Sequence, residues 1–335
     1  MFSYGCKKDK IEQVEKYNPT PVKVSYPSNF PTMIIPADNP MTKEGIALGR
    51  RLFYDPILSG DNTVSCASCH QQGHSFGDPN QFSFGVGGQT GDVQSPTLIN
   101  LAWQDAFFWN GRAKSIEEQV FGPVTNPVEM NSKWSDVITK LKSDASYRKA
   151  FKQAFGTENI DSTHVAKAIA QFERTFISGN SKYDKWLRGE TNFTNDELEG
   201  YYLFFSERGD CFHCHGTILA HDNSFHNNGL DLNPDPGLFN TTGNPNDFGK
   251  FKTSSLRNIE LSAPYMHDGR FQTLAQVLMF YSTGIHKDSP NLSPLMESAA
   301  NGGVQLDAQE MQYLLAFLKT FTDQEFIQNT SFSQP

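Results

Sequence analysis

SCASCHQQGHSFGD (residues 65–78) and DCFHCHGTILAHDN (residues 210–223) each carry two cysteines, two residues apart, followed at once by a histidine. This CxxCH pattern attaches haem of the c type. Each thiol bonds to one vinyl group of the porphyrin, and the histidine binds the iron from one face. Two copies therefore predict two covalently bound haem c groups. The predicted haem residues are Cys66, Cys69 and His70 in the first motif and Cys211, Cys214 and His215 in the second.

Two other uses of the CxxC spacing fit this chain less well. A zinc ribbon pairs two such knuckles about 15–20 residues apart, whereas Cys211 follows His70 by 141 positions. A thioredoxin-like redox motif requires a βαβ unit, and the hydrophobic periodicity of this chain is helical. We therefore interpret both motifs as haem attachment sites.

The composition is that of an acidic protein with a polar surface. Of the 335 residues, 37% are hydrophobic, and the formal net charge is -9. No apolar run reaches the ~18 residues of a membrane helix, so we predict no transmembrane span. The negative charge argues against nucleic acid as a partner and suits a basic redox partner. A homodimer is compatible with the sequence, which does not decide the oligomeric state.

The first 40 residues differ from the rest and predict a lipoprotein-like tether and an extended strap. Cys6 lies in MFSYGCKKDK, with a small residue before it and lysines after it, as at the processed end of a bacterial lipoprotein. A free thiol in a tail is the alternative, because the residues before Cys6 are fewer than the ~7–15 of an apolar signal region. Residues 7–40 are rich in Lys, Glu and Pro and lack periodicity.

Helical patterns dominate after residue 40, so the predicted fold class is mainly α. Three of the helical runs begin with capping residues. These are Asp161 or Ser162, Thr194 with Glu197, and Asp307 with Glu310. We predict helices over 161–178, 195–207, 273–284 and 307–321, and long ordered loops over the Gly- and Asn-rich stretches 72–94 and 222–250.

A weak internal repeat divides the chain into two halves. Residues 97–123 align without gaps with residues 255–281, which lie 158 positions later. Each half contains one CxxCH motif and one of these repeats, so the sequence predicts two related domains. We place the boundary in residues 180–193, with an N-terminal domain over 41–185 and a C-terminal domain over 186–335.

The ligand on the second face of each iron decides whether that haem can react. A haem that only carries electrons usually has Met or His there, whereas a reactive haem leaves the position open. If a helix continued past the first motif, His74 would share the proximal face with His70, and His213 is similarly placed beside the second motif. Residues 79–94 contain neither His nor Met.

Four stretches together resemble the bacterial dihaem cytochrome c peroxidase superfamily, which includes MauG. They are LGRRLFYDPILSGDNTVSCASCH (48–70), SPTLINLAWQDAFFWNGRA (95–113), GPVTNPVEM (122–130) and SLRNIELSAPYMHDGRFQTL (255–274). The resemblance implies two cytochrome c-like α domains whose haems face a shared interface. It also implies that the first haem is the peroxidatic site and that the second receives or stores electrons.

The resemblance assigns roles to further residues. Glu129 matches the acid beside the reacting peroxide, Gln119 contacts the same pocket, and Trp109 matches an aromatic residue between the haems. An interhaem calcium site maps to Gln94, Ser262 and Pro264, with Gln where the family usually has Asn. Because guanidinium groups bind carboxylates in a bidentate manner, we also expect haem propionate partners at Arg112, Arg257 and Arg270.

The chain departs from the peroxidase pattern at two positions. Val86 stands where typical members carry the histidine that closes the peroxidatic iron. Tyr281 stands where they carry the methionine ligand of the second haem, as in the MauG branch, and the repeat pairs Tyr281 with Pro123. The alternatives for Tyr281 are an ordinary core tyrosine, or Met279 as the ligand.

The sequence thus predicts a cytochrome c peroxidase outside the cytoplasm, in the periplasm or attached to a lipid surface. It would reduce hydrogen peroxide to water with electrons from a small cytochrome c or cupredoxin. The first alternative is a MauG-like enzyme that uses peroxide to oxidise a protein, which Tyr281 and Val86 favour. The second is a dihaem electron carrier without catalysis, which would need a ligand on both faces of each iron.

Overall fold

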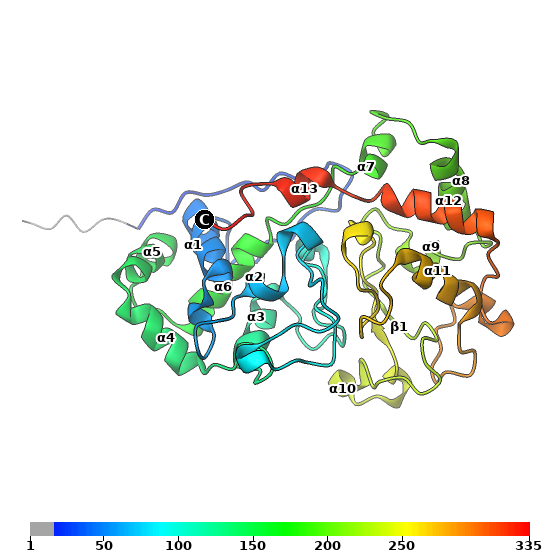
Figure 1. The fold of residues 1–335 in the computed structure, drawn as a ribbon. Coiled ribbons are helices and arrows are strands. Elements are labelled where there is room, and N and C mark those ends of the chain that lie inside the picture. The colour runs from blue at the N-terminus through cyan, green and yellow to red at the C-terminus, as the bar shows by residue number, and fades with distance from the viewer. Residues whose placement is uncertain (1–16) are drawn as a thin grey trace, which may run out of the picture.

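The computed structural model describes residues 17–335 and is mainly helical, which confirms the predicted fold class (Figure 1). Cys6 and the first part of the predicted tether lie outside the described residues. Within residues 17–335, no helix has the length and apolar character that crossing a membrane would require.

Figure 1 shows two helical lobes joined by loops and by extended segments. The first lobe contains α1 (Lys43–Tyr54), α2 (Cys66–Cys69), α3 (Ile116–Thr125), α4 (Trp134–Ser143), α5 (Ala145–Phe155) and α6 (Ser162–Glu173). The second contains α7 (Lys182–Leu187), α8 (Asn195–Phe204), α9 (Phe212–His215), α10 (Phe239–Thr242), α11 (Leu274–Thr283) and α12 (Ala308–Lys319). Two short strands pair antiparallel: β1 (Phe225–His226), which lies inside the predicted loop 222–250, and β2 (Phe251–Lys252), which lies just after it. Helix α13 (Gln324–Gln328) follows α12.

The predicted caps open their helices. The Asp161 side chain accepts a hydrogen bond from the His164 N–H at the start of α6. Thr194 and Asp307 form capping boxes with the third residues of α8 and α12, so these sequence signals set the helix starts. Helix α6 ends at Glu173, five residues before the predicted end. Beyond the helix, the N–H groups of residues 179 and 180 donate to the Asp323 carboxylate.

The internal repeat is a structural repeat. Helix α3 and helix α11 occupy matching positions, 158 residues apart. The bridge between Phe107 and Ala113 recurs between Tyr265 and Phe271. The turn inside each bridge contains a glycine with positive φ, 66° at Gly111 and 65° at residue 269, a conformation that residues with a Cβ rarely adopt. The two halves therefore present their functional residues on the same local scaffold.

Each lobe has its own hydrophobic packing, but the last residues of the chain leave the second lobe and pack on the first. An aromatic cluster under α1 and α6 contains Phe53, Phe76 and Phe176, and it also contains Phe326 and Phe332 from the last residues of the chain. The Tyr54 hydroxyl donates to the Phe332 carbonyl over 2.7 Å. The C-terminal segment therefore packs on the first lobe, a return that the predicted division into 41–185 and 186–335 does not include.

The N-terminal strap connects both lobes as well. Its described part, residues 17–40, packs Phe30 and Met33 against Trp103 of the first lobe and Leu219 of the second. The Trp103 indole N–H donates to the Pro31 carbonyl over 2.8 Å. The strap therefore helps to fix how the two lobes meet.

Removing the Phe332 ring should destabilise the first lobe. Phe332 is 7% exposed and contacts the rings of Phe76, Phe176 and Phe326. We expect Phe332→Ala to lower the free energy of unfolding by about 3–5 kcal/mol, measured by urea denaturation. Phe84→Ala is the matched control, because that ring is 58% exposed and its loss should cost less than about 0.5 kcal/mol. Equal effects in the two variants would contradict the packing of the C-terminal segment.

Candidate active site

The first CxxCH motif holds its histidine in one orientation. Helix α2 ends at Cys69, and the positive φ angles of Ser75 (56°) and Phe76 (58°) turn the chain back. The Phe76 carbonyl thereby accepts a hydrogen bond from His70 Nδ1 over 2.9 Å. The Nδ1 atom must carry the proton, so Nε2 keeps the lone pair that binds a metal.

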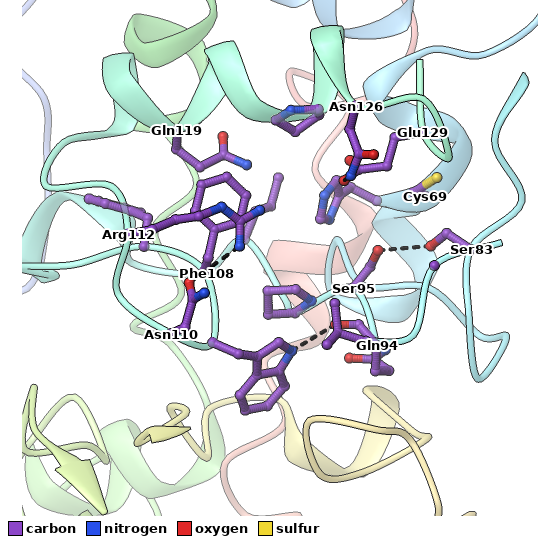
Figure 2. Close-up of a pocket in the computed structure, with 18 of the residues that line it drawn as sticks. Cys69, Ser83, Gln94, Ser95, Phe108, Asn110, Arg112, Gln119, Asn126 and Glu129 are labelled. Atoms are coloured by element: carbon purple, nitrogen blue, oxygen red, sulfur yellow. Dashed lines mark hydrogen bonds between the residues drawn. The ribbon is translucent and has the colours of Figure 1, made fainter. Parts of the chain in front are cut away.

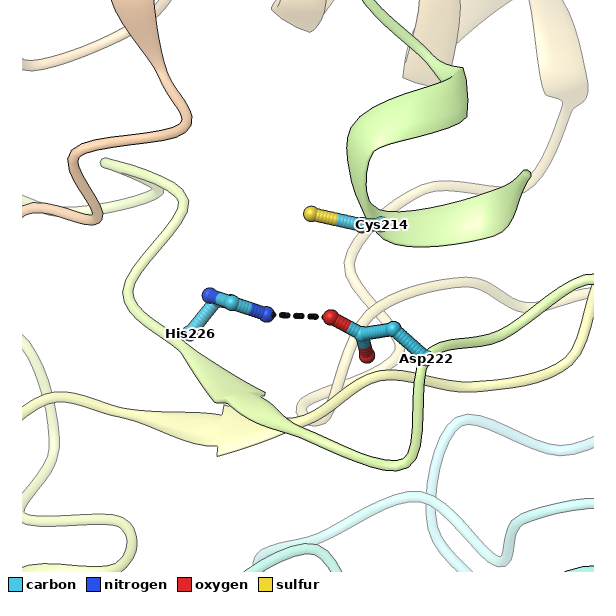
Figure 3. A group of neighbouring side chains, drawn as sticks. All are labelled: Cys214, Asp222 and His226. Carbon is cyan, nitrogen blue, oxygen red and sulfur yellow. Dashed lines mark hydrogen bonds and ion pairs between the residues drawn. The ribbon is translucent and has the colours of Figure 1, made fainter. Parts of the chain in front are cut away.

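The second motif repeats this device. His215 Nδ1 donates to the Ala220 carbonyl over 3.0 Å, and Ala220 has a φ of 54°. Figure 3 shows Cys214 beside Asp222 and His226. The Nε2 atom of His226 lies 2.7 Å from the Asp222 carboxylate. These three groups lie close enough to hold a metal ion. A thioether bond to haem would use the Cys214 sulfur, so we assign the cluster to the edge of the second haem site.

A cavity of about 470 Å³ lies over the first motif and reaches the second lobe (Figure 2). Both cysteines and His70 line it. Of the other residues that the sequence assigned to the first site, the cavity lining contains Gln94, Trp109, Arg112, Gln119 and Glu129. Side chains distant in sequence therefore meet around one space, as the prediction requires.

The residues of this cavity fit a covalently attached haem. Cys66 and Cys69 are free thiols, and burial raises the pKa of both, that of Cys69 to about 11. Neutral thiols beside an unprotonated imidazole nitrogen are the groups that thioether formation and iron binding need. The flat faces of a porphyrin also need apolar contacts, and these are supplied by Leu58, Val64, Leu98, Leu101, Phe107, Val120, Val124 and Ile169.

Glu129 is a half-buried acid at this cavity. Burial raises its pKa, although a hydrogen bond from Asn126 and the charge of Arg112 oppose that effect. The Asn126 amide donates to Glu129 Oε1 over 2.6 Å and fixes the carboxyl group. The Arg112 guanidinium lies over the Phe108 ring, 3.4 Å from its centroid. A carboxyl group with a raised pKa holds its proton more readily than an ordinary surface acid, which suits a group that receives and returns a proton.

Trp109 lies where the two lobes meet. Its indole N–H donates to the Gln94 carbonyl over 2.7 Å, and the Gln94 N–H donates to the His267 carbonyl of the second lobe over 2.7 Å. The ring centroids of Trp109 and His267 are 6.4 Å apart. Trp109 thus occupies the interlobe position that the resemblance implies.

The structure places the two histidines that neighbour the motifs. Helix α2 ends at Cys69, and His74 lies in a separate 3-10 turn within the predicted loop 72–94, outside the cavity lining. His213 lies on α9 and its Nδ1 is 2.7 Å from the Asp210 carboxylate.

The loop over residues 79–94 brings no imidazole or thioether to the cavity. Val86 packs against the hydrophobic cluster of the first lobe that contains Val120 and Val124. Its N–H donates to the Glu129 carbonyl over 2.8 Å. Besides His70, the lining contains His267, whose ring stacks on Phe251 with centroids 3.7 Å apart. Met130 is the methionine of the lining and is 3% exposed.

Tyr281 lies inside the second site. Burial raises its pKa to about 12, and the thiols of Cys214 and Cys211 add to that effect while a hydrogen bond from Asn228 opposes it. The Asn228 amide donates to the Tyr281 hydroxyl over 3.0 Å. Met279, the alternative ligand, is 52% exposed, so its side chain faces solvent.

Met266 is a residue that the sequence reasoning missed. The Asn228 amide lies 3.9 Å from the Met266 sulfur and also bonds Tyr281, which places Met266 at the second site. Its position just before His267 in the PYMH segment was the available signal.

The other two arginines that were predicted as haem propionate partners, Arg257 and Arg270, form ion pairs with acidic side chains. Arg257 is fully buried and forms two hydrogen bonds with the Asp184 carboxylate, 2.8 and 2.9 Å long. Arg270 binds Asp231 and Asp268. Both guanidinium groups therefore have a carboxylate partner within the chain.

The residues of the expected calcium site lie on facing loops. Gln94 is buried, and its side-chain amide donates to the Asp78 carbonyl over 3.2 Å. The Ser262 hydroxyl donates to the Ile259 carbonyl within its own turn. The two loops are in close contact at Gly269. A Cβ built on this glycine would lie 3.2 Å from the Pro264 ring and about as close to Gln81 of the opposite loop.

Two buried groups near the sites were absent from the sequence prediction. Glu173, on the last turn of α6, lines the cavity, and its Oε2 atom has no hydrogen-bond partner. His221 is 3% exposed, and its Nε2 atom has no partner either. Only the fold reveals these residues, because a Glu in a helix and a His in a loop are usually solvated.

Comparisons with known proteins show which family the chain resembles. The family model described as di-haem cytochrome c peroxidase matches residues 43–192. Methylamine utilization protein MauG of Methylorubrum extorquens is 37% identical over 288 residues, which cover 85% of this chain and 80% of that protein. Cytochrome c551 peroxidase of Nitrosomonas europaea is 36% identical over 305 residues, which cover 88% and 85%.

A solved structure is similar over nearly the whole chain. It is a MauG-like protein associated with microbial copper homeostasis, with 37% identity and a TM-score of 0.87. The match covers 94% of this chain and 99% of that one.

The buried pair of Arg257 and Asp184 gives a test of what this arginine does. Asp184→Asn would leave the Arg257 charge buried without a counter-charge, so we expect a loss of about 3–5 kcal/mol in the free energy of unfolding. Asp288→Asn is the control, because Lys287 and Asp288 form an exposed pair worth at most about 1 kcal/mol. Unchanged stability with an altered second-haem spectrum would instead make Arg257 a propionate partner.

Proposed function

Because this chain belongs to the di-haem cytochrome c peroxidase family, we propose that it reduces hydrogen peroxide to water in the cavity over His70. The observation that carries this proposal is the composition of that cavity. It combines an imidazole held for iron, a fixed acid at Glu129 and a loop over 79–94 that supplies no second imidazole or thioether. Electrons would come from a small cytochrome c or cupredoxin.

The side chains of the cavity handle protons and orientation. Bound haem supplies the one-electron chemistry on peroxide. Reduction of one peroxide molecule to two water molecules takes two electrons and two protons. Glu129, held by Asn126, accepts a proton from the oxygen nearer the iron and returns it to the leaving oxygen. Gln119 lines the same space and offers an amide to orient the peroxide.

The second site serves electron transfer. We assign one haem c to each lobe, where His215 and Tyr281 would be the residues that bind the second iron. Tyr281 is the candidate ligand because its phenol lies close enough to Cys211 and Cys214 for their charges to affect its pKa, whereas Met279 points to solvent. Trp109 lies on the route between the sites, in contact with both lobes through Gln94.

A MauG-like activity is the second candidate function. It is favoured by the Tyr281 position and by the 37% identity to a protein named MauG. In that case the oxidising equivalents formed over His70 would pass through Trp109 to a protein bound at the surface. A purely electron-carrying role fits less well, because Val86 leaves the first site open.

The cellular setting and accessory ion are part of the proposal. Covalent haem attachment takes place outside the cytoplasm, so we place the protein in the periplasm, with Cys6 as the candidate lipid anchor. Gln94, Ser262 and Pro264 are the candidate calcium residues between the lobes. Homodimer formation is compatible with this setting.

Glu129 should be needed for the peroxide step. Glu129→Gln keeps the shape but removes the acid, so we expect that step to slow by roughly 100-fold or more while both haems stay attached. Stopped-flow mixing with peroxide measures this. Glu118→Gln, on the exposed side of α3, is the control. A rate close to that of the wild type in Glu129→Gln would remove Glu129 from the mechanism.

Tyr281 should govern the second haem alone. A phenolate ligand favours oxidised iron and Met favours reduced iron, so Tyr281→Met should raise the reduction potential of the second haem. Tyr281→Phe should change the absorption and magnetic resonance spectra of that haem only. Met279→Leu is the matched control and should change neither. If Tyr281→Phe is silent and Met266→Leu alters the spectrum, Met266 is the ligand.

Steady-state turnover tests the function itself. The diferric protein is mixed with peroxide and reduced cytochrome c, and oxidation of the cytochrome is followed. We expect turnover without prior reduction, because no loop ligand has to leave the first iron. Negligible turnover together with oxidation of an added protein would favour the MauG-like activity. Two low-spin ferric signals in the resting protein would contradict the open first site.

A further inference from the structure

The first haem cavity contains a second carboxyl group that the mechanism above does not use. Glu173, on α6, is 4% exposed and lines the cavity together with Ile169 from the preceding turn. Its Oε2 atom makes no hydrogen bond. A buried, unpaired carboxylate is costly, so such a group normally keeps its proton or has a nearby positive charge.

The cation beside Glu173 is Arg174, which bonds another acid through Nη2, while its Nη1 atom has no hydrogen-bond partner. Arg174 is 4% exposed, and its Nη2 atom donates to both carboxylate oxygens of Glu117 over 2.6 and 2.7 Å. Burial raises the pKa of Glu173 to about 8, with Arg174 opposing and Glu117 adding to that effect. The positive charge of Arg174 is thus shared with a closer acid, and Glu173 lacks a dedicated partner.

The groups that face Glu173 come from the elements packed around it. Helix α2 contributes Cys66, whose raised pKa is due first to burial and then to the charge of Glu173. Helix α3 contributes Glu117. The two arginines of helix α1 bind elsewhere, Arg50 to carbonyls of the C-terminal segment and Arg51 to the Ser146 hydroxyl. Glu173 is therefore close to a haem attachment point, and Arg174, the neighbouring cation, is bound to Glu117.

We propose that Glu173 is the proton acceptor coupled to reduction of the first haem site. At a pH where Glu173 is ionised in the oxidised state, entry of one electron from the donor makes the Glu173 carboxylate take up one proton from solvent. When the electron leaves, the proton returns to solvent. The buried cavity then keeps the same net charge in both states, which avoids placing an uncompensated charge in a medium of low dielectric constant.

This role differs from that of Glu129. Glu129 has a fixed donor in Asn126 and Arg112 in the same cavity, which suits transfer of a proton to a reacting oxygen. Glu173 has no such donor and lies beside the first cysteine. Two carboxyl groups in unlike surroundings can thus divide two proton tasks in one cavity. The inference rests on haem attachment at the first motif, and it does not require peroxide turnover.

The test is the midpoint potential of the first haem as a function of pH, measured without peroxide between about pH 6 and pH 10. In the wild type the potential should be constant at low pH, where Glu173 is protonated in both redox states. It should fall as pH rises through the range in which only the reduced state keeps the proton. In Glu173→Gln the amide stays uncharged, so the potential should match the wild-type value at low pH and exceed it at high pH.

Glu118→Gln, on the exposed side of α3, is the control and should keep the wild-type fall of potential with pH. An infrared difference spectrum between the reduced and oxidised wild type gives a second readout. It should gain the stretching band of a protonated carboxyl group on reduction, and Glu173→Gln should lack that band.

A wild-type potential that does not change with pH would overturn the proposal, even if the Glu173 variant fails to fold. A fall of the midpoint potential with pH that persists in Glu173→Gln would also overturn the proposal. The same holds for a fall that disappears in Glu129→Gln but not in Glu173→Gln. Loss of peroxide turnover with these potentials intact would count against the proposed function and leave the role of Glu173 supported.

Discussion

The hydrogen bond from His70 Nδ1 to the Phe76 carbonyl is the contact on which the first site depends. It fixes the tautomer and leaves Nε2 free, and the positive φ angles of residues 75 and 76 make it possible. The same turn buries the Phe76 ring between Phe53 and Phe176, where it stacks on Phe176 at 4.0 Å. The orientation of the imidazole is therefore coupled to the aromatic core of the lobe.

That coupling extends to the ends of the chain. The aromatic cluster around Phe76 is completed by Phe326 and Phe332, which reach it after the chain has formed the second lobe. The strap brings Phe30 against Trp103 and contacts the second lobe at Leu219. Because the segments before and after the lobes bridge them, the spacing between the two haem sites depends on packing far from either motif.

The two halves use one scaffold for different chemistry. Helices α3 and α11 correspond, yet the position that holds Pro123 in the first half holds Tyr281 in the second. Proline offers no donor atom, and both residues lie at their respective sites. The same correspondence pairs Trp109 with His267, and these two rings face one another across the interface. Under the proposed function, divergence at a few positions of a repeat separates a reactive site from an electron-carrying one.

The sequence by itself determined the local features of this protein. The CxxCH spacing, the capping residues at Asp161, Thr194 and Asp307, and the repeat all act over a few residues or recur at a fixed offset, so each is readable without the fold. Only the tertiary structure decided which long-range partners meet: the pairing of Arg257 with Asp184, the return of Phe332 to the first lobe, and the burial of Glu173 without a partner. The physical reason is that desolvation and charge pairing depend on neighbours distant in sequence, and no local pattern encodes those neighbours.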